Sequence, residues 1–315
     1  MSKRKIFILL IVVVFLISAT GCPARKPNAG PSPLNQRYQE EPTLSVYFVE
    51  TGDVQDMRLE EYLKGVVAAE MDPQWPSEAL AAQAIVARTF TMKKMEEGGV
   101  EERGTDASTD IEEFQAYDAD RINENVKQAV ADTRGQVASY EGNLINGWFH
   151  ADGGGLTAAS AAEGLAFTEE APYIHSVEDP GFEITLPENK SWTASFPISQ
   201  VREAVQEAVG SDPGEISTVE VVEEGPSGRA TKVKLGEVTI SGPGLRLALG
   251  STEMRSTLWN EISISGGELV VSGQGYGHGV GLSQWGARAM AEQGETPEDI
   301  VKYFFNNVTI EDLWD

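Results

Sequence analysis

The segment GVVAAEM at residues 65–71 contains one carboxylate, that of Glu70, just ahead of the helix breaker Asp72-Pro73. Apolar neighbours disfavour the ionised form, and the free carbonyls at a helix C-terminus make the local potential negative. Both effects predict a raised pKa for Glu70. A carboxyl that is protonated near neutral pH suits a general acid that protonates the leaving oxygen of a glycosidic bond. The alternative is an exposed Glu in the last turn of a helix, without chemical function.

Three clusters of polar residues could complete such a site. The first comprises Glu70 with Gln83, Arg88 and Thr89, the second His150 and Asp152 before the glycines at 153–155, and the third Tyr276, His278, Ser283, Gln284 and Trp285 within GYGHGVGLSQWGA at 275–287. Tyr276 and Trp285 could stack on sugar faces, while Ser283 and Gln284 could bond sugar hydroxyls. Arg88 could equally be a structural residue that pairs with an acid. A lone His is also more often structural than catalytic.

Metal and nucleophile chemistry are less well supported. His150, Asp152 and His278 could offer nitrogen and oxygen ligands, but their spacing matches no zinc motif. The only cysteine, Cys22, directly follows the apolar leader, and the chain has no G-x-S-x-G motif. We therefore expect neither a metal nor another cofactor.

The leader predicts export. Basic residues at 3–5 precede an uncharged apolar run at 6–20, which is short for a membrane span and fits a signal peptide over residues 1–21. Cys22 stands where a bacterial lipoprotein signal places its lipidated residue, although Ala19 replaces the usual Leu. We expect a protein outside the cytoplasm, held to the bacterial membrane by a lipid on Cys22. Cleavage without lipid, or a short signal anchor, are the alternatives.

Composition sets the remaining limits. Residues 22–43 are rich in Pro, Asn, Gly and Ser and read as a flexible tether, which leaves residues 44–315 as the folded domain. The formal net charge is −25, so nucleic acid, which needs a positive face, is not an expected partner. An anionic membrane surface would also repel this domain.

Hydrophobic patterns predict an α+β fold, as one large domain or two lobes. Helices are expected over residues 58–71, 77–97, 123–133, 201–209, 242–250, 283–293 and 297–305. Strands are expected over residues 44–49, 137–140, 144–149, 219–223, 232–235, 237–240, 262–265 and 268–272. The first two helices would pack as a pair with Glu70 near their elbow, and Ser77 would cap the second.

The same segments resemble a known family. LEEYLKGVVAAEM at 59–71 and ALAAQAIVARTF at 79–90 look like the opening helices of the stage II sporulation protein D family, which includes the amidase-enhancer protein LytB. The resemblance continues through Phe149-His150 with Gly153-Gly154, through residues 245–246 and 254–257, and through GHGVGLSQ at 277–284. It spans roughly residues 44–310.

This resemblance implies peptidoglycan as the substrate, bound in a glycan cleft. It implies lytic transglycosylase activity on glycan strands stripped of stem peptides, with Glu70 as the catalytic acid. Glu70 would protonate the oxygen between MurNAc and GlcNAc and then take the proton of the muramoyl C6 hydroxyl as a 1,6-anhydro ring closes. Hydrolases usually need a second acid about 5–10 Å away, and no equally marked partner is present.

The chain departs from the family pattern in two places. Ala151-Asp152 stand where Ser or Thr is usual, and Gly155 is a third glycine, which makes Asp152 a candidate second carboxylate. Sporulation members often carry a transmembrane anchor, so the programme served, sporulation or general wall remodelling, stays open. Two other functions are a non-catalytic wall-binding enhancer of an N-acetylmuramoyl-L-alanine amidase, and a peptide-binding lipoprotein.

Overall fold

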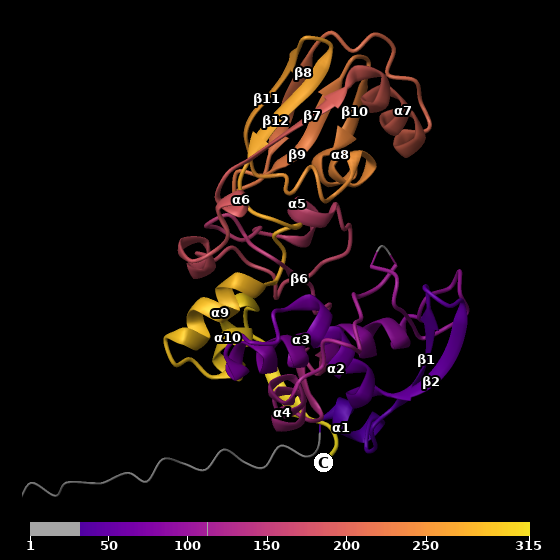
Figure 1. Cartoon of the computed structure of the whole chain (residues 1–315), viewed down its shortest axis with the longest axis vertical. Coiled ribbons are helices and arrows are strands. Elements are labelled where there is room, and N and C mark those ends of the chain that lie inside the picture. The colour runs from indigo at the N-terminus through magenta and orange to yellow at the C-terminus, as the bar shows by residue number, and fades with distance from the viewer. Residues whose placement is uncertain (1–31, 112) are drawn as a thin grey trace, which may run out of the picture.

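The computed structural model describes residues 32–111 and 113–315, which form two bodies, one above the other in Figure 1. The lower body combines the beginning and the end of the described chain, and its core runs from Leu34 to Trp314. The upper body has its own core, from Trp192 to Val271. The predicted α+β class is confirmed.

The upper body is an insertion into the lower one. The chain leaves through β6 (Phe149–His150) and returns through β13 (Leu282–Ser283), and these two short strands pair in parallel. The strand expected over 144–149 is therefore split between two sheets. Its first part is β5 (Asn143–Leu144), which pairs with β4 (Gln136–Tyr140), and its last part is β6. Periodicity could not show this, because the partner of β6 is far away in the sequence.

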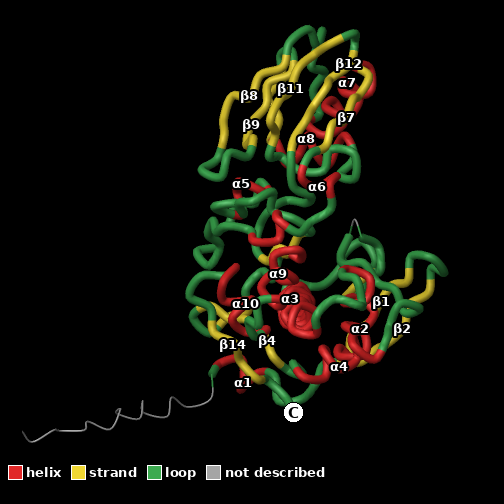
Figure 2. The backbone as a smooth tube through the Cα atoms, turned by 60° about the vertical axis from the view of Figure 1, so that its left-hand side comes forward, coloured by secondary structure: helices red, strands yellow, loops and turns green. Residues whose placement is uncertain are grey.

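Helices α2 (Leu59–Glu70) and α3 (Ser77–Glu96) form the expected pair. Figure 2 shows α3 in the middle of the lower body, where it also contacts α4 (Glu124–Asp132), α9 (Gln284–Glu292) and α10 (Pro297–Phe304). Its many alanines allow this close approach on several sides. The cap prediction was wrong: Pro76 is the N-cap residue, and the Ser77 hydroxyl instead donates to the Glu78 carboxylate at 3.1 Å.

The described part of the expected tether is folded. Helix α1 (Pro33–Arg37) buries Leu34 completely, and the Ser32 side chain caps it by accepting from the Asn35 N–H. The Tyr38 hydroxyl then donates to a carboxylate oxygen of Glu96 at 3.0 Å. The expected start of the domain at residue 44 is therefore about ten residues too late. The expected signal peptide and Cys22 lie outside the described residues.

Two more sheets complete the lower body. Strand β1 (Thr43–Phe48) pairs with β2 (Asp53–Arg58) and β3 (Ala107–Ser108), and β14 (Thr309–Asp312) pairs with β4. The pattern analysis missed β2 because most of its side chains are exposed and show no alternation. Within the described residues, no helix is both long and apolar enough to cross a membrane.

The upper body consists of two three-stranded sheets and two helices. The sheet order is β10-β9-β8 in one and β11-β12-β7 in the other. The strands and helices are β7 (Trp192–Pro197), α7 (Ile198–Val209), β8 (Val219–Glu224), β9 (Ala230–Leu235), β10 (Val238–Ser241), α8 (Gly242–Leu249), β11 (Trp259–Ser265) and β12 (Glu268–Gly273). Between the bodies lie α5 (Ala161–Leu165), the 3₁₀ helix η1 (Pro180–Glu183) and α6 (Pro187–Lys190).

Candidate active site

The carboxyl of Glu70 is half-buried between segments from distant parts of the chain. Its Oε1 accepts a hydrogen bond from the Ala116 N–H at 3.0 Å, and its Oε2 accepts one from Gln284 Nε2 at 3.2 Å. Burial raises the pKa of Glu70 to about 7, although both hydrogen bonds favour the ionised form. Glu70 can therefore hold or release a proton near neutral pH.

One of the two expected causes of this pKa shift, free carbonyls at the end of α2, is not found. The carbonyls at the end of α2 are not free, because the Arg121 guanidinium donates to the carbonyl oxygens of Ala69 and Met71 at 3.1 and 3.2 Å. The Met71 N–H also bonds the Val67 carbonyl. An open helix terminus does not set the potential here. Removal of the carboxyl from water raises its pKa, which was the second expected cause.

A loop covers Glu70 because Gly65 leaves room for it. A Cβ on Gly65 would come within 2.1 Å of the Tyr117 ring, which lies directly on α2. The same ring stacks on Tyr62 at 5.8 Å, and the Asp118 N–H bonds the Gly65 carbonyl at 3.0 Å. These contacts bring the Ala116 N–H to Glu70. The sequence analysis placed Gly65 beside Glu70 but missed its function of admitting this loop.

Helix α9 supplies the other wall of the site. Ser283 caps it by accepting from the Gly286 N–H at 3.1 Å, and Gln284, its first residue, bonds Glu70. The next residue, Trp285, packs against Trp75 with ring centroids 4.8 Å apart. Trp75 comes from the break between α2 and α3, which the sequence analysis interpreted only as an interruption. The nearby Pro residues predicted the turn, but no local pattern indicated that Trp75 would pack against Trp285.

The two candidate histidines bond the backbone of a glycine-rich loop, and their function as substrate ligands stays a prediction. Their ring centroids are 5.6 Å apart, and both side chains bond the backbone of Val280, His150 through its carbonyl and His278 through its N–H. Burial lowers the pKa of His278 to about 3 and that of His150 well below its ordinary value, helped by Arg229 and, for His278, more strongly by Arg246. Both imidazoles are therefore neutral near neutral pH.

Asp152 and Tyr276 tie the two glycine-rich loops together. Each donates its N–H to the carbonyl of the other at 2.9 Å. The Asp152 side chain is 1% exposed and accepts from the Gly154 N–H, while the Tyr276 ring lies 4.6 Å from the Arg255 guanidinium. Asp152 is thus enclosed in the loop and makes no hydrogen bond to Glu70. Its function as a second carboxylate or as a substrate ligand stays a prediction.

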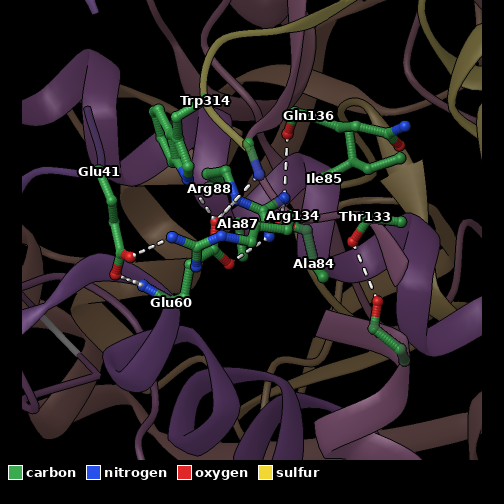
Figure 3. A network of polar contacts seen from close by, with 12 residues as sticks. Glu41, Glu60, Ala84, Ile85, Ala87, Arg88, Thr133, Arg134, Gln136 and Trp314 are labelled. Carbon is green, nitrogen blue, oxygen red and sulfur yellow. Dashed lines mark hydrogen bonds and ion pairs between the residues drawn. The ribbon is translucent and has the colours of Figure 1, made fainter. Parts of the chain in front are cut away.

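Arg88 has the structural function that the sequence left open. Its guanidinium donates to both oxygens of Glu60, at 3.0 and 2.6 Å, and to the Gln136 carbonyl at 2.9 Å (Figure 3). The side chain has no exposed surface with which to meet a substrate. Gln83 is also completely buried, and neither polar atom of its amide has a hydrogen-bond partner within the described structure.

Two surface hollows lie away from this site. One, of about 590 Å³, lies between α5 and the β8–β10 sheet, and the other, of about 550 Å³, lies between α3, α4 and α10. Glu70 lines neither of them. In the described part of the chain, His, Cys, Asp and Glu side chains do not gather in groups of three that could hold a metal ion.

Two family models match parts of this chain. Residues 48–140, which include α2 and α3, match the family model described as stage II sporulation protein, and residues 169–281 match a domain of unknown function that includes the upper body. The chain is 31% identical to stage II sporulation protein D of Bacillus amyloliquefaciens, over 86% of this chain and 81% of that protein. It is 30% identical to the protein of that name in Bacillus subtilis (strain 168), over 85% of this chain and 78% of the relative.

A more distant relative carries a different name. The chain is 28% identical to the amidase enhancer of Bacillus subtilis (strain 168), over 79% of this chain but only 40% of that longer protein. The similarity to the sporulation proteins extends across most of both partners, and the matched family model contains the helix that ends in Glu70. The chain therefore belongs to the stage II sporulation protein D family.

Proposed function

We propose that this protein is a peptidoglycan lytic transglycosylase that cleaves the bond between MurNAc and GlcNAc, with Glu70 as its general acid and base. One observation carries the proposal: a half-buried carboxyl with a pKa of about 7, held between the Ala116 N–H and the Gln284 amide. Membership of the stage II sporulation protein D family, which includes relatives named for sporulation and for amidase enhancement, supports a function at the cell wall.

The two forms of Glu70 serve two successive steps. The protonated carboxyl gives its proton to the glycosidic oxygen as the bond to the muramoyl C1 breaks. The resulting carboxylate then takes the proton of the muramoyl C6 hydroxyl, whose oxygen bonds C1 and closes the 1,6-anhydro ring. Glu70 ends protonated, so no second proton donor is required.

The surroundings of Glu70 suit a mechanism with one carboxylate. Its two hydrogen bonds come from neutral groups, Ala116 and Gln284. Asp152, the candidate second acid, is enclosed and bonded to the Gly154 N–H. Trp75 and Trp285, which are only partly buried and pack against each other, are aromatic side chains on which sugar rings can stack.

The test is cleavage of purified glycan strands without stem peptides, with 1,6-anhydro products detected by mass spectrometry. Glu70→Gln keeps the shape and one acceptor but removes the titrating proton, so we expect a rate about 10²- to 10⁴-fold lower. The matched control is Glu61→Gln on the same helix, where an exposed carboxylate pairs with Lys64. A wild-type rate of anhydro product formation in the Glu70 variant would refute the mechanism.

The similarity to an amidase enhancer supports a second candidate function, a non-catalytic protein that binds glycan and stimulates an N-acetylmuramoyl-L-alanine amidase. The same experiment separates the two. An enhancer releases no product alone, still binds glycan strands in a pull-down, and raises the rate when an amidase is added. Glu70→Gln would leave that stimulation unchanged.

We also propose that a lipid on Cys22 anchors the protein outside the cytoplasm. The described fold begins with Ser32, which caps α1. Nine residues, 23–31, separate Cys22 from Ser32 in the sequence, and this length of chain can span at most about 35 Å. Charge repulsion would keep the acidic domain from lying on an anionic membrane surface.

A further inference from the structure

Three segments that are distant in sequence meet at the first turn of α9, and the side chain of Asp179 lies at their centre. Asp179 Oδ2 accepts from the Gly153 N–H at 2.6 Å, and Oδ1 accepts from the Gly181 N–H at 3.0 Å. The Ser283 hydroxyl is also a hydrogen-bond partner of this carboxyl. Asp179 is only 4% exposed. One buried carboxyl thus connects the loop after β6, the start of η1 and the start of α9.

The packing at this point leaves no space between η1 and α9. A Cβ on Gly286 would lie 2.6 Å from Asp179 Oδ1, and a Cβ on Gly181 would lie 2.3 Å from the Gly286 nitrogen. Two positions without a side chain therefore allow the carboxyl to reach the helix. The Trp285 N–H adds a bond to the Ala151 carbonyl at 3.0 Å.

A short path leads from Asp179 to Glu70. The Ser283 hydroxyl donates a hydrogen bond to Asp179. The Ser283 oxygen also accepts a hydrogen bond from the Gly286 N–H and so caps α9. The next residue, Gln284, donates to Glu70 Oε2 at 3.2 Å. We propose that Asp179 is a positioning residue that fixes the first turn of α9 and, through Gln284, orients the Glu70 carboxyl. This inference rests on the proposed function, because it assigns a task within that site.

The charge of Asp179 matters for this task. Burial raises its pKa to about 6, and Asp152 raises it further, whereas the bonds from Ser283 and the backbone favour the ionised form. An ionised carboxylate accepts stronger hydrogen bonds than a neutral acid, and it complements the positive N-terminal end of α9. The first turn of α9 is therefore held most firmly when Asp179 is ionised.

Arg229, His150, Tyr303 and Asp152 are titratable groups with shifted pKa values around Asp179, and burial raises the pKa of Asp152 as well. Arg229 stays positive, since burial lowers its pKa only to about 10, and its interaction with Asp179 opposes that shift. His150 is neutral, and the pKa of Tyr303 on α10 is raised. Asp152 is the neighbour whose charge shifts the midpoint of Asp179.

The connection from Asp179 through Ser283 and Gln284 to Glu70, called the relay below, predicts a bell-shaped pH profile for kcat/KM. Activity needs Asp179 ionised, above about pH 6, and Glu70 protonated, below about pH 7. The acidic limb would belong to Asp179 and the alkaline limb to Glu70. Replacing a residue that only stabilises the fold would lower kcat/KM at every pH and would leave both limbs of the profile in place.

The experiment measures this profile for the purified protein and for Asp179→Asn. We expect the variant to lose the acidic limb, keep the alkaline limb and fall about 10- to 100-fold at its optimum, the cost of small errors in positioning. Asp152→Asn is the matched control, because its carboxylate makes no hydrogen bond to α9. It should keep the acidic limb but move it to lower pH. An unchanged acidic limb in Asp179→Asn would overturn the inference.

A second variant and a second measurement cover the case in which Asp179→Asn does not fold. Ser283→Ala cuts the path at its middle and should also flatten the acidic limb. In NMR spectra of the wild-type protein, the side-chain amide of Gln284 should shift with midpoints near both pKa values, and Ser283→Ala should lose the lower one. Retention of that lower midpoint would exclude the relay. A protein that shows both midpoints but cleaves no glycan would refute the proposed function alone.

Discussion

Replacing Arg88 by Met tests the buried network in Figure 3, which fixes α2 against α3 and the C-terminal segment. Glu60 accepts four hydrogen bonds, two from Arg88, one from the Gly135 N–H and one from Trp314 Nε1. The two side chains of the ion pair are 0% and 8% exposed. Met fills most of the volume of Arg, so the main effect is a buried carboxylate without its cation. Breaking such a pair from one side costs about 3–5 kcal/mol.

The measurement is urea unfolding, followed by circular dichroism and by the fluorescence of the six Trp residues, of which Trp314 lies in the core of the lower body. Arg58→Met is the matched control, because the ion pair of Arg58 with Glu41 is 58% exposed on the arginine side and should contribute less than about 1 kcal/mol. The double variant Glu60→Gln/Arg88→Met removes both charges and should recover a large part of the loss. A lower body as stable in Arg88→Met as in Arg58→Met would refute the reasoning, and so would a double variant less stable than Arg88→Met.

Two further predictions concern stability and location. The folded state raises the pKa of Glu70 from 4.5 to about 7, so this group weakens the fold as pH rises through that interval. Glu70→Gln should therefore be more stable than wild type above pH 7, by up to about 3 kcal/mol, and the gain should vanish below pH 4.5. Denaturation at several pH values measures this, and a difference independent of pH would contradict it. For the anchor, Cys22→Ala should move the protein from the membrane fraction to the soluble fraction, and an unchanged distribution would argue against the lipid.

The sequence predicted the position of Glu70 because the features that place this residue are local. A small-residue run that ends at Asp72-Pro73 defines the end of α2 and places Glu70 there. The same reasoning gave the direction of the pKa shift, although it counted an open helix terminus that Arg121 in fact closes. The partner of Arg88 was left undecided, since sequence cannot show which acid a buried guanidinium will meet.

What the sequence determined by itself is what depends on neighbouring residues: the helix pair around the elbow, the α+β class and the position of Glu70 at the end of α2. Tertiary structure decided which groups surround that acid. Gln284 lies 214 positions from Glu70, and the loop that carries Ala116 reaches the carboxyl only because Gly65 admits Tyr117. A carboxyl loses its water only when separate segments close around it. The local pattern gave the direction of the pKa shift at this site, but the groups that produce it are a property of long-range packing.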